Sequence, residues 1–538
     1  MVNKFTLLTL GTILVAGSAI AGEKVSLNSP VVGKKADIQT LMQKHSENAA
    51  LRGPKKESGI NNVITEVPGT EKIYTKSAVG YDQGAEYDES DMASAIVFGE
   101  NNEVYIRDIL TSMGANSYVK GVLNGDVITV SLPQTVYYSE TYDYGVNVCM
   151  MQINSAQTNY EVTDIESVEL SYNAETGVIT LELDDPYEYI LGAAYSDDDS
   201  WLGFGDIYQE YEPTDLVANG IPAGVEVEEW AYSDGYNAYN VGVAIDGDTL
   251  YIKGLSQSLP GGVIMAEING NKANVSGGQV IGTYVYYLIY TMVADYDGQS
   301  LTMVDNDYIL DLDLENKTIV GSNGNTYLLY NAGYEEPYYL DVFNEFAIIY
   351  QESYAGTPVN PFGLDVYDYM STYGSYDFSF FVPNVSTEGT MLQTDSFYYR
   401  IYVDGKLFEL DEKTYMGVSG VISNIPYNFQ NGFDIYSDQG DPNRVVALYF
   451  DTMTTLGVQS VYIYDGETTE SAVVTLNLET GDITEGDAGV DTINVSDVMN
   501  VTYFDLNGRK VSNPDKGVYV VKMQLNDGSS VTRKVVRR

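Results

Sequence analysis

Residues 97–138 read VFGENNEVYIRDILTSMGANSYVKGVLNGDVITVSLPQTVYY, and residues 243–283 read VAIDGDTLYIKGLSQSLPGGVIMAEINGNKANVSGGQVIGT. The second stretch repeats the pattern of the first, at an offset of 146 residues at its start and 145 after one gap. The alignment pairs Tyr105-Ile106 with Tyr251-Ile252, Asn124-Gly125 with Asn269-Gly270, and Gln134 with Gln279. Because strand-like run, turn and glutamine recur in the same order, the pattern predicts two related domains, 81–215 and 220–350.

The rest of the chain shows the same pattern: short runs of alternating Val, Ile, Tyr and Thr are separated by turns that contain glycine. Asn-Gly and Asp-Gly tolerate the positive φ angles of tight hairpins. Such pairs stand at Asn124-Gly125, Asp246-Gly247, Asn269-Gly270, Asp404-Gly405, Asp465-Gly466 and Asn507-Gly508. The pattern predicts an all-β protein of tandem sandwich-like domains. Beyond the N-terminus, convincing helical periodicity is confined to the stretch around Asp37 to His45.

Further domains follow from composition. Residues 376–485 hold spaced strands and turns that suggest a third domain of immunoglobulin or fibronectin type III kind. Residues 22–80 are polar and mildly basic, and residues 351–375 are rich in loop formers, so both segments are predicted to be linkers. The last segment, 490–538, forms a small β domain of its own.

The first residues, 1–21, have the layout of a cleavable secretory signal: a basic start at Lys4, an apolar run from Leu7 to Val15, and small residues up to Ala21. The apolar run is too short to span a bilayer, and no later stretch is long and apolar enough, so we expect an exported protein that is not integral to a membrane. The one cysteine, Cys149, cannot form an intramolecular disulfide and is expected in the core.

The net charge of the chain restricts the classes of molecule that it can bind. The chain has a net charge of −50, and residues 77–499 hold nine basic residues against 68 acidic ones. Such a surface repels phosphate backbones and anionic lipid, which excludes nucleic acid as a partner. Divalent cations and neutral glycans remain.

Histidine chemistry is nearly excluded, because His45 is the one histidine and falls in the predicted linker, where we expect it to be solvated. Carboxylate chemistry stays open, since a glycoside hydrolase needs two facing acids. One cluster could bind a sugar: Asp197, Asp198 and Asp199 precede Trp201, whose ring could stack on the sugar while the acids accept its hydroxyls. The alternative is an exposed acidic loop that Trp201 anchors to the sheet.

Calcium is the one cofactor that the composition leaves open, because clustered Asp and Asn oxygens suit a hard cation. The turn at Asp438, Asp441 and Asn443 offers such ligands. No other cofactor is expected, since no glycine-rich phosphate loop stands between a strand and a helix.

The tail YFDLNGRKVSNPDKGVYVVKMQLNDGSSVTRKVVRR (503 to 538) resembles the C-terminal sorting domain of bacterial type IX secretion cargo. The resemblance rests on the order of a few residues at the very end of the chain: Asp505, Gly508, Arg509, Gly517, Tyr519 and Lys534. A Pro-Asn-Pro strand that usually opens the domain does not occur between 485 and 500. The likeness is therefore to the distal half of the domain, or to a shortened version seen in some secreted proteins of that bacterial phylum. The alternative is a terminal hairpin that completes the third domain.

The resemblance implies that the type IX secretion machinery recognises the tail and carries the protein to the cell surface or beyond. The two repeats also resemble β domains of uncharacterised exported proteins of the same bacteria. We therefore expect a protein without enzymatic activity that binds a glycan or a host surface protein. A carboxylate-based glycoside hydrolase or other glycan-processing enzyme is the alternative, and a structural surface component is a third.

Overall fold

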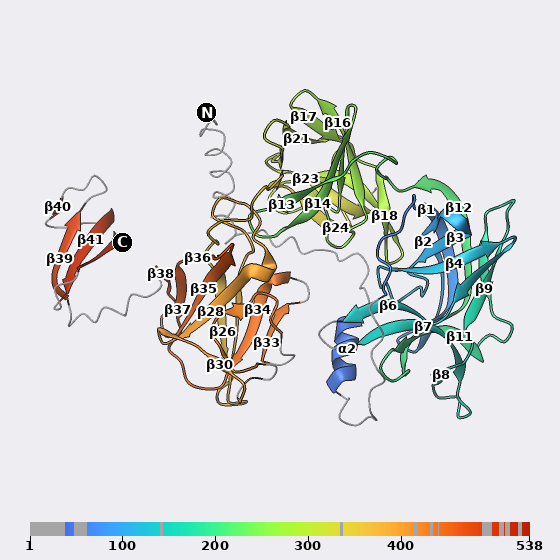
Figure 1. The fold of residues 1–538 in the computed structure, drawn as a ribbon, viewed down its shortest axis with the longest axis horizontal. Helices are drawn as coiled ribbons and strands as arrows, with labels where there is room; N and C mark the ends of the chain where they lie inside the picture. The colour runs from blue at the N-terminus through green and yellow to red at the C-terminus, as the bar shows by residue number, and fades with distance from the viewer. Residues whose placement is uncertain are drawn as a thin grey trace. The chain divides into compact units, whose positions relative to one another are not determined.

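The chain is nearly all β, which confirms the predicted all-β class (Figure 1). The prediction of sandwich-like repeats was wrong, because the strands of each repeat close into a barrel with a side sheet. The computed structural model describes residues 38–47, 62–139, 144–333, 337–413, 415, 418–430, 434–438, 441–486, 498–504, 510–511, 517–525 and 530–537. The predicted signal, 1–21, lies outside them. Among the described residues there is one α-helix, α2 (Ile38–Glu47), where the periodicity around Asp37 to His45 predicted it. Two short 3₁₀ turns are η3 (Glu100–Asn102) and η4 (Thr394–Ser396).

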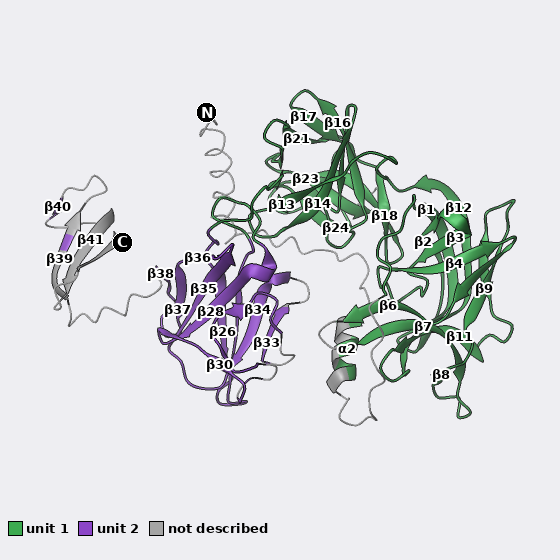
Figure 2. Cartoon of the chain, in the orientation of Figure 1, with its two compact units in different colours: residues 1–356, 385–392 green, residues 357–384, 393–538 purple. Residues whose placement is uncertain are grey.

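The chain divides into two compact units (Figure 2). Unit 1 comprises 1–356 and 385–392, and unit 2 comprises 357–384 and 393–538. Both repeats lie in unit 1. The short segment 385–392 falls inside the predicted third domain, yet Val385 and Met391 pack with Ala231 and Ala238 of the second repeat.

The first repeat is built on a ring of eight antiparallel strands. Strand β1 pairs with both β2 and β12, so the order β1-β2-β3-β4-β5-β9-β10-β12 closes on itself. These strands are β1 (Lys72–Asp82), β2 (Ala85–Phe98), β3 (Glu103–Arg107), β4 (Tyr118–Asn124), β5 (Val127–Ser131), β9 (Ser167–Tyr172), β10 (Ile179–Glu182) and β12 (Trp201–Val217). Because β1 begins at Lys72, the repeat starts within the segment 22–80 that we expected to be a linker.

A side sheet branches from the ring along β12. The end of β12 near Trp201 pairs with β11, while its later residues pair with β1 and β10. The sheet continues in the order β11-β7-β6, and β8 pairs with β7. Its strands are β11 (Tyr189–Tyr195), β7 (Tyr144–Ile153), β6 (Gln134–Ser139) and β8 (Tyr160–Val162).

The second repeat has the same strand order. Its closed barrel runs β13-β14-β15-β16-β17-β21-β22-β25, and its side sheet runs β18-β19-β23-β24 with β20 on β19. The barrel strands are β13 (Glu228–Ser233), β14 (Ala238–Asp246), β15 (Thr249–Lys253), β16 (Val263–Asn269), β17 (Lys272–Val275), β21 (Tyr308–Asp313), β22 (Thr318–Gly321) and β25 (Phe346–Ile349). The side-sheet strands are β18 (Val280–Tyr284), β19 (Tyr287–Tyr296), β20 (Leu301–Met303), β23 (Thr326–Ala332) and β24 (Tyr339–Phe343). One difference stands out, because β24 and β25 divide the role of the single long strand β12.

The aligned glutamines make the same three backbone contacts in both repeats, and Gln279 also accepts from Asn219 Nδ2 at 2.8 Å. The Gln134 side chain accepts from Lys120 N–H and donates to the carbonyls of Lys120 and Ser131, each at 2.8 Å. The Gln279 side chain accepts from Met265 N–H at 2.9 Å and donates to the carbonyls of Met265 at 2.8 Å and Ser276 at 3.1 Å. Each glutamine therefore joins a barrel strand, β4 in the first repeat and β16 in the second, to the start of the side sheet.

Both barrels are filled by their own side chains. An eight-stranded barrel is just wide enough for side chains to fill, and alternate residues of each strand point inward. The first core includes Ile106, Val130 and Leu170, and the second includes Ile252, Val275 and Leu310, all fully buried. A ligand that binds these domains therefore binds outside the barrels.

Up to residue 486, the described residues of unit 2 form two larger sheets and a two-stranded one. The first, β26-β27-β34-β33, comprises β26 (Phe362–Asp368), β27 (Tyr376–Phe381), β34 (Asp441–Tyr449) and β33 (Ile435–Asp438). The second comprises β29 (Lys406–Leu407), β28 (Phe397–Val403), β35 (Thr455–Tyr464), β37 (Val473–Asn477) and β38 (Ile483–Gly486), with β32 (Ile425–Pro426) and β36 (Glu467–Glu470) beside them. The pair is β30 (Leu410–Asp411) and β31 (Val421–Ile422). The ring of Phe380 in β27 contacts that of Tyr399 in β28, which joins the two larger sheets. Strand β26 lies in the segment 351–375 that we expected to be a linker.

The end of the chain forms a four-stranded sheet in the order β40-β39-β41-β42. Its strands are β39 (Val498–Phe504), β40 (Lys510–Val511), β41 (Gly517–Leu525) and β42 (Ser530–Arg537). Gly517 and Tyr519 lie in β41 and Lys534 in β42, where Tyr519 pairs with Val535. Asp505, Gly508 and Arg509 lie outside the described residues.

Candidate functional site

A groove of about 550 Å³ lies where the β9–β10 hairpin of the first repeat meets the side sheet. Strand β9 alternates so that Val168 and Leu170 are buried while Ser167, Glu169 and Ser171 face outward. The groove residues beyond β9 are Val127, Met150, Ile165, Thr180, Glu182, Leu183, Asp184, Asp185 and Tyr189. Val168 and Leu170 also line the groove, so both buried apolar side chains and exposed polar ones border it.

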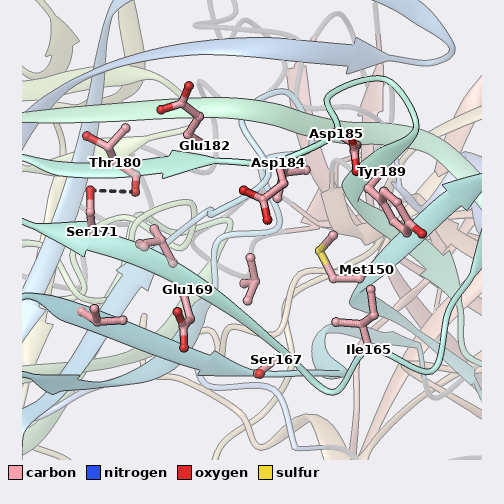
Figure 3. Close-up of a pocket in the computed structure, with 14 residues that line it drawn as sticks. Met150, Ile165, Ser167, Glu169, Ser171, Thr180, Glu182, Asp184, Asp185 and Tyr189 are labelled. Atoms are coloured by element: carbon pink, nitrogen blue, oxygen red, sulfur yellow. Dashed lines mark hydrogen bonds between the residues drawn. The ribbon is translucent and has the colours of Figure 1, made fainter.

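The groove combines acidic and apolar parts (Figure 3). Glu169 and Asp184 come from β9 and from the segment after β10, and in this view Met150, Ile165 and Tyr189 lie together beyond them. All four carboxylates, those of Glu169, Glu182, Asp184 and Asp185, are exposed to solvent. Such a surface can accept hydrogen bonds from hydroxyl or amine groups and can pack against an apolar face.

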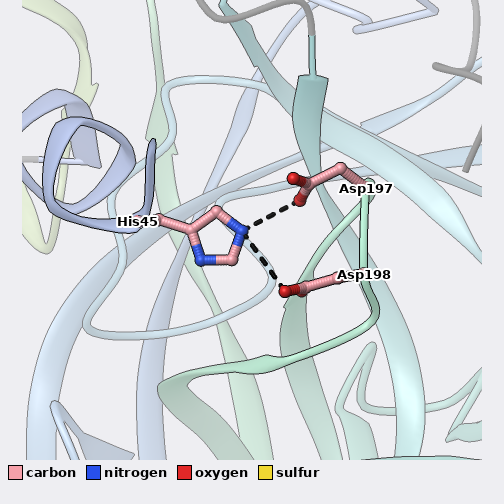
Figure 4. Close-up of side chains that lie close together, drawn as sticks. All are labelled: His45, Asp197 and Asp198. Carbon is pink, nitrogen blue, oxygen red and sulfur yellow. Dashed lines mark hydrogen bonds and ion pairs between the residues drawn. The ribbon is translucent and has the colours of Figure 1, made fainter. Parts of the chain in front are cut away.

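A second cluster joins α2 to the turn between β11 and β12 (Figure 4). His45 Nε2 lies 2.9 Å from Asp197 Oδ1 and 3.7 Å from Asp198 Oδ2. Our expectation of a solvated histidine was wrong, because His45 is 6% exposed. Apolar residues of α2, Ile38 and Met42, are buried in the core of the first repeat and carry the histidine there.

The four predicted ligand-binding residues do not form one site: the three aspartates lie in the turn that faces His45, and Trp201 packs against Tyr160. Asp197 is 5% exposed and faces His45, whereas Asp198 accepts from Ser200 N–H at 2.9 Å and thereby shapes the turn. Asp199 has a φ of +60° in the same turn. Trp201 packs edge-on against the ring of Tyr160, with centroids 5.1 Å apart, and its Nε1 donates to the Phe204 carbonyl at 2.9 Å.

Trp201 and the histidine lie on opposite faces of the side sheet. Tyr195, which stacks on His45, belongs to the main core of the repeat, whereas Trp201 packs with Cys149 and Ile190 on the other face. These contacts match the anchoring alternative for Trp201. Cys149 is buried, as expected, and burial raises the pKa of its thiol to about 12.

The proposed calcium turn lies in unit 2, at the junction of β33 and β34. Asp438 pairs with Asp441 through the backbone, and Asp441 accepts from Asn443 N–H at 3.1 Å. Asn443 is 1% exposed, and its side-chain oxygen accepts from the Tyr427 hydroxyl. That oxygen is therefore directed into the domain. Calcium binding here stays a prediction.

Sequence reasoning missed one aspartate in each repeat that accepts a hydrogen bond from a loop hydroxyl. In the first repeat, Asp206 of β12 is 1% exposed and accepts hydrogen bonds from Thr111, Tyr87 and Gln209. Lys76 Nζ lies 3.7 Å from Asp206 and is itself 3% exposed. Burial lowers the pKa of Lys76 to about 8, although the nearby Asp206 opposes the shift.

In the second repeat, Asp341 of β24 corresponds to Asp206 of the first repeat. It accepts a hydrogen bond from Ser256, which aligns with Thr111 at the offset of 145. Burial raises the pKa of Asp341 to about 6, and hydrogen bonds from Ser256 and Ser258 oppose the rise. The signal that could have found this pair is Asp-Ile-Tyr-Gln-Glu-Tyr at 206–211 against Asp-Val-Phe-Asn-Glu-Phe at 341–346, at a different offset of 135.

No protein-family model matches this chain, and no curated protein matches it. Among the described residues, no helix has the length and apolar character needed to cross a membrane.

Proposed function

We propose that this chain is an exported, surface-displayed or secreted protein that binds a glycan through the groove on its first repeat. The observation that carries the proposal is the composition of the groove. Sugar hydroxyls donate hydrogen bonds, and the carboxylates of Glu169, Glu182, Asp184 and Asp185 accept them. The hydroxyl-bearing side chains Ser167, Ser171 and Thr180 add further partners.

The apolar end of the groove supports the same ligand class. Tyr189 offers a half-buried ring, which suits the C–H face of a sugar, and Met150 is buried behind the groove in the core. A host surface protein rich in lysine would also fit the acidic lining, and it is the alternative partner. A comparison of glycosylated with deglycosylated mucin distinguishes a glycan from a protein partner.

A carboxylate-based glycoside hydrolase is the second candidate function, because the groove holds several acids. Hydrolysis needs a pair in which one carboxyl is kept protonated by an apolar surrounding. The four groove carboxylates are exposed instead, which favours binding over catalysis.

The C-terminal sheet is proposed to be the sorting signal for type IX secretion, on the resemblance of its sequence. Fusing residues 490–538 to a periplasmic reporter in a bacterium with that machinery should release the reporter outside the cell. Release that is equal in a fusion carrying Gly517→Ala and Tyr519→Ala would contradict these residues' role.

The binding proposal is tested with the mature chain, 22–538, on a panel of polysaccharides, mucins and deglycosylated mucins, with and without calcium. Retention and sugar release are scored together. The triple variant Glu169→Gln, Asp184→Asn, Asp185→Asn should lose retention. The matched control Glu479→Gln, Asp482→Asn, Glu485→Gln removes the same charge from exposed positions of unit 2 and should keep it.

Each outcome has one meaning. Retention by glycosylated mucin that the groove variant loses supports the proposal. Retention by deglycosylated mucin alone indicates a protein partner, and sugar release that the groove variant abolishes makes the chain an enzyme. Equal retention in both variants would contradict the groove.

A further inference from the structure

The last turn of α2 brings the one histidine of the chain against two carboxylates. Two tyrosines hold the helix in place, because the Tyr144 hydroxyl donates to the Met42 carbonyl at 2.6 Å and the Tyr195 hydroxyl donates to the Leu41 carbonyl at 3.1 Å. The position of His45 therefore follows from contacts that do not involve its own side chain.

The imidazole ring is also fixed in its plane. Tyr195 stacks on it with ring centroids 3.5 Å apart and 16° between the planes, and Tyr144 meets it edge-on at 5.3 Å. Nε2 consequently faces the turn that contains Asp197 and Asp198 (Figure 4). A ligand set that is oriented in advance loses little conformational freedom on binding an ion.

The separations of the ligand atoms match those around a small divalent ion. Bonds of about 2.0–2.1 Å in a tetrahedral site place the ligand atoms about 3.3 Å apart. The two observed separations from Nε2, 2.9 Å and 3.7 Å, lie on either side of that value. All three ligand atoms lie within 4.8 Å of one another. Small rotations of the two carboxylates would suffice to surround an ion.

The charges of the cluster are an independent reason to expect a bound divalent ion. Nε2 carries at most one proton, and that proton can be donated well to one carboxylate only. Asp197 is almost fully buried, and a buried carboxylate needs close compensation. A divalent ion between the three groups would neutralise both carboxylates at once, with the imidazole neutral.

We propose that His45 Nε2, Asp197 Oδ1 and Asp198 Oδ2 bind a zinc-type divalent ion that fastens α2 to the β11–β12 turn. One imidazole with two carboxylates is a ligand set that suits zinc, with water in the fourth position. Calcium prefers six to eight oxygen ligands and is the poorer match. The site is separate from the groove, and the ion here would be structural.

The test uses the single histidine. The mature chain, made with ¹⁵N-labelled histidine and a histidine-free tag, gives imidazole nitrogen signals from one ring. Adding zinc chloride should replace the Nε2 signal by that of a zinc-bound ring, complete at one equivalent. Calcium chloride at millimolar concentration should leave the signal unchanged. Calorimetry of the same titration gives the affinity.

Two substitutions in one turn separate the ligand from its neighbour. Asp198→Asn should weaken zinc binding by at least ~10-fold, because even residues behind the ligands cost that much in metal sites. Asp199→Asn removes the same charge, keeps a residue that tolerates the positive φ of this position, and should leave the affinity unchanged.

Two results would overturn the proposal. One is an Nε2 signal that does not respond to saturating zinc, which would leave His45 in a plain hydrogen bond with Asp197. The other is an equal zinc affinity in the native chain and in Asp198→Asn, which would place the bound zinc elsewhere.

Discussion

The two repeats of unit 1 place an aspartate at corresponding points and surround it differently. Asp206 accepts from Thr111 and has Lys76 beside it, whereas Asp341 accepts from Ser256 and its pKa is raised to about 6. The second repeat, 220–350, contains three basic residues, and Lys253, Lys272 and Lys317 each bond to another carboxylate.

The comparison distinguishes an interaction that both repeats share, the hydroxyl-to-aspartate hydrogen bond, from one that only the first repeat has, the nearby lysine. In both repeats the hydroxyl-to-aspartate bond ties down the loop that places apolar side chains in the barrel, Ile109 in the first and Leu255 in the second. That bond requires an acceptor but no counter-charge. In the first repeat a buried lysine lies beside the aspartate, whereas burial raises the pKa of the aspartate in the second.

The largest effect is expected from Lys76→Met in the first barrel. Removing one partner of a buried ion pair leaves the other uncompensated and costs about 3 kcal/mol or more. Hydrogen–deuterium exchange of the full chain should show faster exchange in β1 and β12 and no change in β24. The double variant Lys76→Met, Asp206→Asn should recover part of the loss, and no recovery would mean that Lys76 acts through packing alone.

The two barrels should also respond to pH with opposite sign. The pKa of Asp341 is about 6 in the fold and 3.8 in the unfolded chain, so its contribution is complete below pH 3.8 and is lost as pH rises through 6. The loss is at most about 3 kcal/mol, because the carboxyl is partly exposed. Asp341→Asn should remove this dependence in β24, as followed by exchange between pH 4 and 7.

Lys76 gives the reverse trend. Its pKa of about 8 is below the 10.5 of an unfolded lysine, so its contribution is complete above pH 10.5 and is lost as pH falls through 8. The first barrel should therefore open less readily at pH 9 than at pH 7, and Lys76→Met should abolish that gain. A native chain whose β12 exchange free energy is flat over this range would contradict the burial of an ionisable lysine.

A smaller effect is expected where the repeats make the same backbone contacts. Gln134→Ala and Gln279→Ala each remove one amide that makes three backbone hydrogen bonds, so each should destabilise its own repeat by about 1–2 kcal/mol. Gln279→Ala should cost at least as much as Gln134→Ala, because Gln279 also accepts from Asn219. Hydrogen–deuterium exchange in β4 and β16 measures the two losses of stability. A clearly larger loss for Gln134→Ala would contradict the structural equivalence of the repeats.

The sequence predicted the parts of this fold that depend on local pattern. The all-β class followed from alternation, and five of the six Asn-Gly and Asp-Gly turns have a positive φ at glycine: Gly125, Gly247, Gly270, Gly405 and Gly466. Gly508 lies outside the described residues. The alternation did not reveal that the barrels close, because closure depends on the pairing of β1 with β12, which are far apart in the chain.

The sites were harder to predict for the same reason. The cluster of His45 and Asp197 joins residues 152 positions apart, through a helix whose apolar side chains enter the core. The groove carboxylates looked like ordinary exposed strand and loop acids. Asp206 and Asp341 escaped notice because the segment before β12 is longer than that before β24, which changes the offset from 145 to 135.

The measurement that tests the proposed groove most directly is hydrogen–deuterium exchange of the mature chain with and without the polysaccharide that retains it. Binding in the groove predicts slower exchange in residues 167–171 and 180–189 of the first repeat, with the corresponding strands β21 and β22 of the second unchanged. Slower exchange confined to the second repeat or to unit 2 would contradict it.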